Sequence, residues 1–329
     1  MERYNKYKRS KNEFILEDFD FMLTLGCGSF GRVFLALPKN KLFVDKACAI
    51  KRFKKAPLVE QKQVIHIMNE KRLLKYVDHP FIVKMFGTFK DPYYLYICTE
   101  YVDGGEFFNY LRRRRKLDNE EAKFYAAQVT LIFEYLHSLN IVYRDLKPEN
   151  LVFGDDGYLK MVDFGFAKIV EFRTYTLCGT PDYICPEILL NKGHGKPVDW
   201  WTLGILVYEM LVGYPPFYSD NPIGIYRNII AGHIRFPQNM DKAAINFINS
   251  LVTSDLGKRL GCLKNGPDDV KQMEWLHNIN FNELLKKEVN PPYVPHVRDI
   301  METEGIDLEP DSPKRPEPVI GRDDPFHDW

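Results

Sequence analysis

The sequence lacks any apolar run close to the ~20 residues that span a membrane, and its start, MERYNKYKRS, lacks the apolar core of a secretory signal. No glycine follows the first methionine, so N-myristoylation is not indicated. The chain has no net charge, since 45 basic side chains balance 45 acidic ones. That balance gives no general attraction to polyanions. We therefore expect no membrane span and no nucleic-acid partner.

Cysteine is also scarce. The six cysteines (27, 48, 98, 178, 185 and 262) are scattered and form no C-x-x-C pair. This pattern favours reduced thiols over disulfides or zinc, and it is typical of a cytoplasmic or nuclear protein. A chain of 329 residues is long enough for two lobes, each with its own core.

The first hundred residues are rich in predicted strands. Residues 19–35 alternate β-forming side chains around a glycine turn and predict a hairpin. Residues 47–53 and 95–102 predict two further strands, and residues 61–77 carry apolar side chains at helical spacing. A small lobe with one main helix is expected.

Helical patterns follow the glycine-bearing connector DGGE. Residues 120–139 predict a long amphipathic helix, and residues 198–213 are apolar almost all round, which predicts a buried one. The last fifty residues become proline-rich and acidic, which is typical of an extended surface tail. The order is therefore small lobe, hinge, larger helical lobe and tail.

The glycine motif GCGSFG, residues 26–31, is weak evidence alone, since such glycines also serve ordinary turns. A dinucleotide-binding fold would need a helix directly after it, whereas RVFLAL continues as a strand. Lys51 follows in AIK on the same strand face as Ala49, and Glu70 lies on the next helix. Lys51 alone would be read as a surface lysine, but paired with Glu70 it could direct its ammonium toward phosphates.

A dense polar stretch, YRDLKPEN (residues 143–150), stands between the apolar segments IV and LVF. Asp163, in VDFGFA, follows 18 residues after Asp145. An acidic residue beside a glycine could simply be a turn. The argument is the joint occurrence, in one order, of glycine loop, lysine, glutamate, RD-x-K-x-x-N and DFG.

From about Phe19 onward the chain resembles eukaryotic protein kinases, most of all the AGC group and its cyclic-AMP-dependent catalytic subunits of protist type. The motifs that carry this resemblance are LGCGSFGRV, NEKRLL, EYVDGGEFF, YRDLKPENL, DFGFAK, RTYTLCGTPDY, PVDWWTLGILVYEM, YPPF, KRLGCLKNG and PFHDW. It implies an α+β bilobal kinase fold, with an antiparallel β-rich N-lobe, a mainly helical C-lobe and an AGC tail. The implied boundaries are an N-terminal extension 1–18, N-lobe 19–101, hinge 102–106, C-lobe 107–277 and tail 278–329.

The resemblance implies transfer of the γ-phosphate of Mg-ATP to serine or threonine. Asp145 would orient the substrate hydroxyl and accept its proton, with Lys147 and Thr180 beside it. Lys51, fixed by Glu70, would bind the α- and β-phosphates. The implied ligands of Mg²⁺ are Asn150 and Asp163.

The nucleotide would contact positions of the glycine loop, the sheet and the hinge. These are Leu25, Gly26, Cys27, Gly28, Ser29, Phe30, Gly31, Arg32, Val33, Ala49, Lys51, Thr99, Glu100, Val102, Glu106 and Val152. Two of them depart from the family. Val152 stands where leucine is usual, and Thr99 occupies the gatekeeper position, where these kinases commonly carry methionine.

Glu106, Glu149 and Glu209 match the positions that read arginines upstream of the acceptor. Any single one could be a structural ion pair instead. Leu177 would line the pocket for an apolar residue after the acceptor, and Asp182 stands where glutamate is usual.

Thr176 is implied to be the activation-loop phosphosite, with Arg144, Lys168 and His66 as partners of its phosphate. Arg173, three residues before it, makes self-phosphorylation plausible. Cys178, in the same segment, is a candidate for redox control, whereas Cys185, in C-P-E, is expected to be a small buried residue. Glu187 with Arg259, and Asp199 with the catalytic-loop backbone, are implied to be structural.

The closing Phe326 and Trp329 resemble the hydrophobic motif that docks on the small lobe and supports the Glu70 helix. Ser312 or Glu317 would serve as the turn motif, and Ile306 to Leu308 give no substitute for the family's F-D-D-Y. RRRRK (112–116) reads as a solvated helix end, a nuclear signal or a partner contact.

Three functional interpretations remain: an active kinase, a pseudokinase scaffold, and a kinase with another switch, such as cyclic GMP. A pseudokinase usually loses Lys51, Asp145 or Asp163, and all three are present. The expected partners are arginine-bearing protein substrates and a separate cyclic-AMP-binding regulatory subunit.

Overall fold

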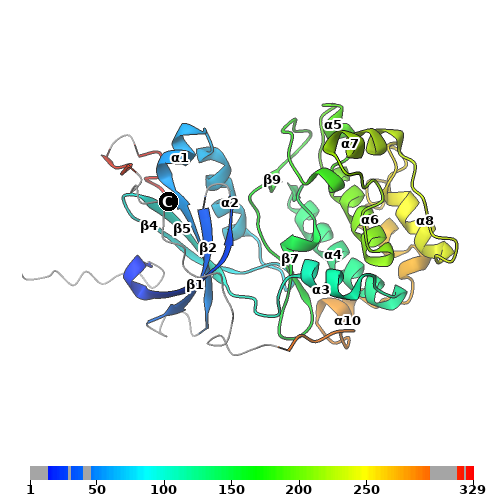
Figure 1. The fold of residues 1–329 in the computed structure, drawn as a ribbon, viewed down its shortest axis with the longest axis horizontal. Coiled ribbons are helices and arrows are strands. Elements are labelled where there is room, and N and C mark those ends of the chain that lie inside the picture. The colour runs from blue at the N-terminus through cyan, green and yellow to red at the C-terminus, as the bar shows by residue number, and fades with distance from the viewer. Residues whose placement is uncertain (1–13, 29–30, 40–45, 297–316, 322–323) are drawn as a thin grey trace, which may run out of the picture. The chain divides into compact units, whose positions relative to one another are not determined.

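The structure is a computed structural model that describes residues 14–28, 31–39, 46–296, 317–321 and 324–329. The described residues divide into two compact units (Figure 1). Unit 1 is drawn from residues 1–76, 83–101 and 298–329, and unit 2 is drawn from 77–82 and 102–297. In the described part of the chain, no helix is both long and apolar enough to cross a bilayer.

Unit 1 is built on one antiparallel sheet of five strands in the order β1-β2-β3-β5-β4. The strands are β1 (Phe19–Cys27), β2 (Gly31–Pro38), β3 (Cys48–Lys54), β4 (Met85–Lys90) and β5 (Tyr94–Glu100). The predicted hairpin is confirmed, because β1 and β2 pair directly. Two helices follow β3, namely α1 (Lys55–Glu60) and the predicted main helix α2 (Val64–Tyr76).

One face of this sheet is packed in a core, and buried side chains therefore recur at every second position of β3 from Cys48 to Ile50. Cys48, Ile50 and Cys98 are fully buried on that face, together with Phe19 and Phe89, whose rings stack 5.6 Å apart. On the opposite face, Ala49 and Lys51 of β3 are only half-buried, whereas Leu95 and Ile97 of β5 are buried. That face is therefore the more open one along β3.

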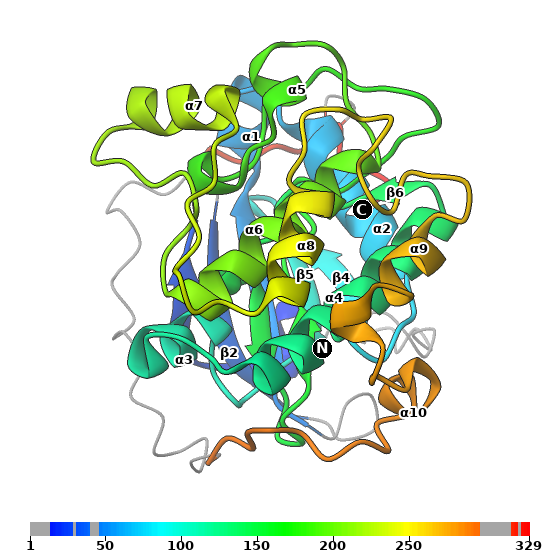
Figure 2. The ribbon, with the colours of Figure 1, turned by 90° about the vertical axis from the view of Figure 1, so that its right-hand side faces the viewer.

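Unit 2 is mainly helical (Figure 2). Its longer helices are α3 (Phe107–Arg114), α4 (Asn119–Ser138), α6 (Pro197–Val212), α7 (Pro222–Ala231) and α8 (Lys242–Leu251). The shorter helices are α5 (Pro186–Leu189), α9 (Pro267–Lys271) and α10 (Phe281–Leu285). As predicted, α6 is buried almost all round, and it packs against α4 and α8.

Two short strand pairs flank the polar stretch of residues 143–150. β6 (Ile141–Val142) pairs with β9 (Lys168–Ile169), and β7 (Leu151–Phe153) pairs with β8 (Leu159–Met161). The predicted strands IV and LVF are confirmed. Because both ends of residues 143–150 are tied to buried strands, the polar side chains between them have little freedom.

The predicted Glu187–Arg259 ion pair is present and buried. Arg259 donates to both carboxylate oxygens of Glu187, at 2.5 and 3.1 Å, and also to the backbone carbonyl of Thr253. A buried charge is costly unless it is paired and hydrogen-bonded, and this one is both. The pair fixes α5 to the loop that follows α8.

The C-terminal segment docks on unit 1, as the hydrophobic motif predicted. Phe326 is fully buried, and the Trp329 indole nitrogen donates to the Phe89 carbonyl at 2.9 Å. Lys71 of α2 donates to the Asp328 carbonyl at 2.8 Å and lies over the Trp329 ring. The helix that carries Glu70 is therefore braced by the end of the chain. Ser312 and residues 306–308 lie outside the described residues, and the role of Glu317 stays a prediction.

A buried ion pair adds to this anchor. Lys55 is 1% exposed and donates to the Asp324 carboxylate at 3.0 Å and to the Val319 carbonyl at 3.2 Å. Burial opposes ionisation of Asp324, but its hydrogen bond from Phe326 and the charge of Lys55 hold its pKa below the ordinary value. The pair ties the tail to the start of α1.

We predict that Asp324→Asn lowers the free energy of unfolding of unit 1 by about 1.5–3 kcal/mol, because a buried lysine loses its counter-ion. Denaturant titration at neutral pH measures this. The difference should shrink as the pH falls through the lowered pKa of Asp324, since protonation removes the same charge. The control is Asp20→Asn, whose partner Lys39 is exposed; it should cost no more than about 0.5 kcal/mol. Equal losses in the two variants would contradict the prediction.

Candidate active site

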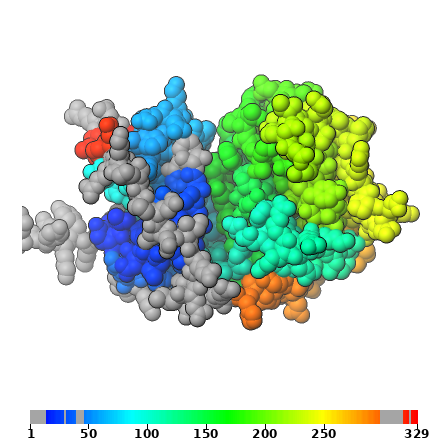
Figure 3. Space-filling view, viewed as in Figure 1, coloured from blue at the N-terminus to red at the C-terminus, as the bar shows by residue number. Residues whose placement is uncertain are grey.

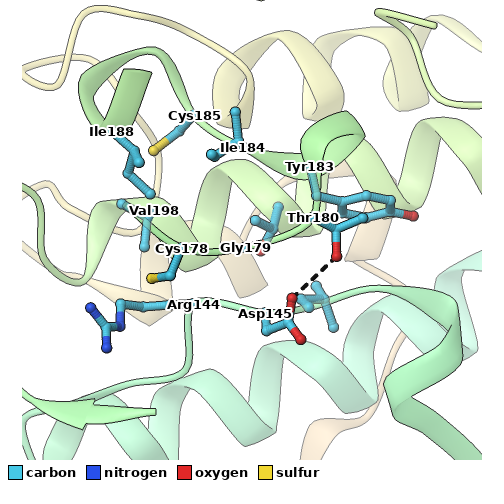
Figure 4. Close-up of a pocket in the computed structure, with 12 residues that line it drawn as sticks. Arg144, Asp145, Cys178, Gly179, Thr180, Tyr183, Ile184, Cys185, Ile188 and Val198 are labelled. Atoms are coloured by element: carbon cyan, nitrogen blue, oxygen red, sulfur yellow. Dashed lines mark hydrogen bonds between the residues drawn. The ribbon is translucent and has the colours of Figure 1, made fainter. Parts of the chain in front are cut away.

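Four polar side chains of unit 2 converge at the catalytic loop, as predicted. Lys147 lies 3.1 Å from the Asp145 carboxylate and donates to the Thr180 hydroxyl at 3.2 Å. Thr180 donates to the other Asp145 oxygen at 3.2 Å, and the dashed line of Figure 4 marks this bond. The side-chain amide of Asn150 donates to the Asp145 carboxylate at 2.8 Å and to the Asp145 backbone carbonyl at 2.9 Å. Asp145 is therefore fixed from three sides.

A buried aspartate on α6 binds the backbone of the catalytic loop. Asp199 is 0% exposed and accepts from the amides of Tyr143 (2.9 Å) and Arg144 (2.8 Å) and from the His137 imidazole (2.8 Å). The structural role predicted for Asp199 is confirmed. Arg144 has a φ of 69°, in the left-handed region that side chains with a Cβ seldom adopt. These bonds hold that strained turn, and strain of this kind concentrates at functional sites.

The electrostatics of Asp145 suit a proton acceptor. Burial raises the pKa of its carboxyl above the ordinary aspartate value, while Lys147 and Asn150 partly oppose the shift. A higher pKa makes a carboxylate a better base, provided that it stays ionised at the working pH.

Asp163 and Asn150 come from neighbouring segments. The Val162 amide donates to the Asn150 carbonyl at 2.9 Å, which fixes the DFG segment beside the loop. Phe164 is fully buried against the Tyr143 ring, whereas Asp163 is exposed with a φ of 56°. The buried phenylalanine thus anchors a strained turn that presents the aspartate.

The donor set of these two residues fits Mg²⁺. The Asn150 amide nitrogen is engaged by Asp145, and this orientation leaves its oxygen for a hard cation. Asp163 supplies a carboxylate, one oxygen of which accepts from the Gly165 amide at 3.0 Å. The described residues contain no cluster of three or more His, Cys, Asp or Glu side chains that would hold a metal alone. Two ligands suit Mg²⁺, which keeps several waters and phosphate oxygens.

In unit 1 the predicted Lys51–Glu70 pair is formed, with 2.7 Å between the ammonium and the carboxylate. Glu70 is buried on α2, so it fixes the lysine head group. Lys51 lies on the more open face of the sheet, where Val33 pairs with it and Ala49 pairs with Thr99. Val33, Ala49, Lys51 and Thr99 therefore share one face. Arg32 and Glu100, which were also predicted to contact the nucleotide, pair with Arg52 and Cys48 and lie on the other face.

The glycine loop leaves space above its backbone. A Cβ at Gly31 would lie 2.0 Å from the Arg52 carbonyl, so only glycine fits there. Among the described residues, a Cβ at Gly26 would meet nothing within 4 Å, and one at Gly28 would meet only the Gly31 carbonyl at 3.7 Å. Packing does not require these two glycines, and their free space suits close approach by a phosphate. Ser29 and Phe30 lie outside the described residues.

The three predicted arginine-reading glutamates gather in unit 2 with a fourth carboxylate, Asp182. Burial and then the charge of Glu149 raise the pKa of Glu106. Burial is also the main cause of the raised pKa values of Asp182 and Glu209, and Glu149 again adds to both. Mutual repulsion of this kind places the four carboxylates close together. One oxygen of Asp182 is buried and has no hydrogen-bond partner in the described part of the chain, a feature that the sequence did not indicate.

The activation segment carries Thr176 and Leu177 at its surface, and Leu177 is 71% exposed. Lys168 donates to the hydroxyl of Thr174 at 3.0 Å. His66 belongs to unit 1, where its ring bonds to Gln63 at 2.6 Å. The phosphate-binding roles of Arg144, Lys168 and His66 stay predictions.

The redox expectation for Cys178 is wrong. Its side chain is 7% exposed and lines a small cavity with Arg144, Cys185 and Ile188 (Figure 4). Burial raises the pKa of the Cys178 thiol, whereas reactive cysteines are accessible and have a lowered pKa. Cys185 is buried as predicted, and burial raises its pKa as well.

The arginine run ends α3 at the surface of unit 2 (Figure 3). Arg114 pairs with Glu121 at 2.6 Å, and Arg112 lies over the Phe108 ring. Arg115 ends the helix with a φ of 67°. These contacts agree with a solvated helix end, and a role in partner binding stays a prediction.

Comparison with known proteins agrees with this geometry. The family model of the protein kinase domain matches residues 19–276, and the chain therefore belongs to the protein kinase domain family.

Several relatives are named as cAMP-dependent protein kinase catalytic subunits. The one from Arthrobotrys oligospora is 48% identical over 89% of this chain and 56% of its own length. Catalytic subunit 3 of Drosophila melanogaster is 45% identical over 94% of this chain and 52% of its own length. The human catalytic subunit PRKX is 45% identical over 90% of this chain and 82% of its own length. The chain thus spans about half the length of the first two.

Proposed function

We propose that the chain is a serine/threonine protein kinase that uses Mg-ATP, of the cAMP-dependent catalytic-subunit type. The observation that carries this proposal is the cluster of Asp145, Lys147, Asn150 and Thr180, in which one buried carboxylate is held by three partners. A pseudokinase would have no need of such a preorganised base. The identities of the relatives support the type of kinase.

In the proposed reaction, Asp145 accepts a hydrogen bond from the substrate hydroxyl and then its proton as the bond to the γ-phosphorus forms and the bond to the β-phosphate oxygen breaks. Lys147 neutralises charge on the transferred group, and Thr180 keeps both side chains in place. Lys51, held by Glu70, binds the α- and β-phosphates. Much of the acceleration comes from this positioning, since little covalent chemistry is required of the protein.

Mg²⁺, held by Asn150 and Asp163, would neutralise phosphate charge when it is bound. The cradle of Gly26 and Gly28 supports close contact between the loop backbone and the phosphates. Adenine would lie against the open sheet face, with Val152 of β7 on its other side. Glu100 and Val102 would offer backbone groups to it, and Glu106 would bind the ribose.

We further propose that substrates carry arginines at positions −3 and −2 from the acceptor, and that Leu177 contacts the residue after it. The support is the group of four carboxylates around Glu149. A guanidinium would relieve their repulsion and form paired hydrogen bonds. Because burial raises the pKa values of Glu106, Asp182 and Glu209, these three carboxyls complete their ionisation only above the ordinary range. The affinity for arginine-bearing peptides should therefore rise with pH through that range.

A peptide array with Mg-ATP tests the activity and the arginine preference together, and Glu149→Gln tests its origin. Glu149 is exposed, so its replacement should leave the fold intact. We predict that the variant raises the KM for the arginine peptide about 10–100-fold, the value of one charged hydrogen bond, and leaves the KM for ATP unchanged. The matched control is Glu274→Gln, which is also exposed. Equal phosphorylation of arginine-free peptides by the unaltered chain would contradict the proposal.

Thr99 should set inhibitor sensitivity. Its hydroxyl donates to the Ala49 carbonyl at 3.3 Å on the open sheet face, and a methionine there would project further toward a bound purine. We predict that Thr99→Met weakens inhibition by bulky purine-like compounds at least about tenfold, because overpacking costs about 1–3 kcal/mol. Dose–response curves at matched ATP saturation measure this. Equal inhibition of the two proteins would contradict it.

The proposal extends to the setting of the enzyme. We infer a separate cAMP-binding regulatory subunit that places an inhibitory segment across Glu106, Glu149 and Glu209, and a cytoplasmic or nuclear location. A cyclic-GMP-dependent enzyme is the alternative. Pull-down with a cAMP-responsive subunit, followed by release with cAMP but not with cyclic GMP, distinguishes the two.

A further inference from the structure

Two buried polar atoms beside the activation segment have no hydrogen-bond partner among the described residues. They are Nη1 of Arg144 and Nε2 of His194. The two side chains are only 6% and 4% exposed. Buried groups of this kind normally find a partner, so each unpaired one calls for an explanation.

Thr174 ties His194 to the activation segment. Its amide donates to the His194 carbonyl at 2.9 Å, and the His194 amide returns a bond of 2.8 Å to the Thr174 carbonyl. Lys168 donates to the Thr174 hydroxyl at 3.0 Å. Gly195 follows His194, and a Cβ there would lie 3.2 Å from the Phe172 carbonyl. His194 is thus fixed against the segment, on the same threonine that Lys168 contacts.

The residues two positions before and after Thr176 lie beside basic side chains. Thr174 contacts Lys168, and Cys178 lines the cavity beside Arg144 (Figure 4). Thr174 and Cys178 are buried, whereas Tyr175 and Leu177 are 63% and 71% exposed. In an extended segment, side chains two residues apart share one side. By this spacing Thr176 has the same parity as Thr174 and Cys178, and its own exposure leaves room for an added group.

We propose that His194 is a ligand of the phosphate on Thr176, completing within unit 2 a site with Arg144 and Lys168. The inference rests on the proposed function in that a kinase activation segment is phosphorylated there, and it adds a third basic residue to the predicted partners. The unpaired Nη1 and Nε2 would each donate to a phosphate oxygen, which satisfies both buried atoms.

The charges around His194 make its protonation depend on that phosphate. Burial lowers its pKa to about 4, and the charge of Arg144 adds to this effect, as does that of Lys168, while Glu187 and Asp199 oppose it. The imidazole is therefore neutral at pH 7 without phosphate. A phosphate dianion favours the imidazolium, so phosphorylation should raise the His194 pKa and take up a proton. The contact should then strengthen as the pH falls through the raised pKa.

The test uses the full chain with phosphothreonine inserted at position 176 during translation, so that it does not depend on the chain's own activity. Histidine rings are labelled with ¹³C, and the His194 signal is assigned by its loss in His194→Gln and His194→Asn. We expect phosphorylation to raise the His194 pKa by at least one unit, while the ring signals of exposed His233 keep the same positions with and without the phosphate. An unchanged His194 pKa, or a rise only when phosphothreonine is placed at 174, would overturn the proposal. Inorganic phosphate titrated into the unmodified chain should not reproduce the shift, and full reproduction would assign the site to free anions instead.

A second readout follows the phosphate itself. A broad-specificity phosphatase should remove it from His194→Gln about tenfold faster than from the unaltered chain at pH 6.5, and the difference should fade by pH 8.5. His233→Gln supplies the matched control, since its dephosphorylation rate should follow that of the unaltered chain. Equal rates for all three proteins at both pH values would overturn the proposal, whether or not the chain proves to be an active kinase.

Discussion

Asp145→Asn should lower kcat for peptide phosphorylation by about 10²–10⁴-fold, which is the usual contribution of a general base. The amide keeps the size of the carboxylate and can still bond to Thr180, but it cannot accept the substrate proton. ATP binding relies on other side chains, so the KM for ATP should change little. Steady-state kinetics with a serine peptide that carries two upstream arginines measure both values.

The pH profile supplies a second check on the same residue. Because burial raises the pKa of Asp145, the acid limb of kcat/KM should lie above the ordinary aspartate range, with activity lost as the pH falls through it. Asp155→Asn, an exposed loop aspartate of the same unit, is the control and should keep the full rate. A variant of Asp145 that retained more than a tenth of the activity would rule out its assigned role.

Thr176→Ala should be the second severe loss, lowering kcat/KM by about 100-fold. An unmodified segment lacks the phosphate that would bind Arg144, Lys168 and His194. The buried Arg144 and His194 alone would contribute two charge-assisted hydrogen bonds, which at about 1.5 kcal/mol each correspond to this factor. Order in the segment matters because Thr180, four residues further on, contacts both Asp145 and Lys147. Activity and phosphate content at residue 176 are measured together.

Thr176→Ser is the matched comparison, since serine keeps an acceptor hydroxyl and should retain most of the activity once it is phosphorylated. Near-normal turnover by Thr176→Ala would show that segment order does not depend on this phosphate. The fold should be unaffected in either case, because Thr176 is exposed.

The strongly periodic elements could be predicted from sequence. Residues 120–139 and 198–213 carry an unbroken helical pattern, and the helices α4 and α6 follow within a residue. The catalytic cluster was predictable for a different reason: Asp145, Lys147 and Asn150 lie within one short loop, so that local sequence and family motif coincide.

Contacts between residues far apart in the sequence could not be predicted in this way. Lys55 and Asp324 are separated by 269 positions, and neither lies in a motif that suggests the other. Cys178 lies in a segment with exposed neighbours, so only the packed structure reveals its burial. His194 carries no motif at all, and its significance comes from an unpaired nitrogen beside Thr174.

The central claim is that Lys51, held by Glu70, and the aspartates Asp145 and Asp163 act on one molecule of Mg-ATP. A crystal structure of the chain with Mg²⁺ and a non-hydrolysable ATP analogue tests this most directly. The account predicts that Lys51 contacts the α- and β-phosphates while Asn150 and Asp163 coordinate the metal and Asp145 faces the γ-phosphate. An analogue bound away from Lys51, or a metal coordinated without Asp163, would contradict it.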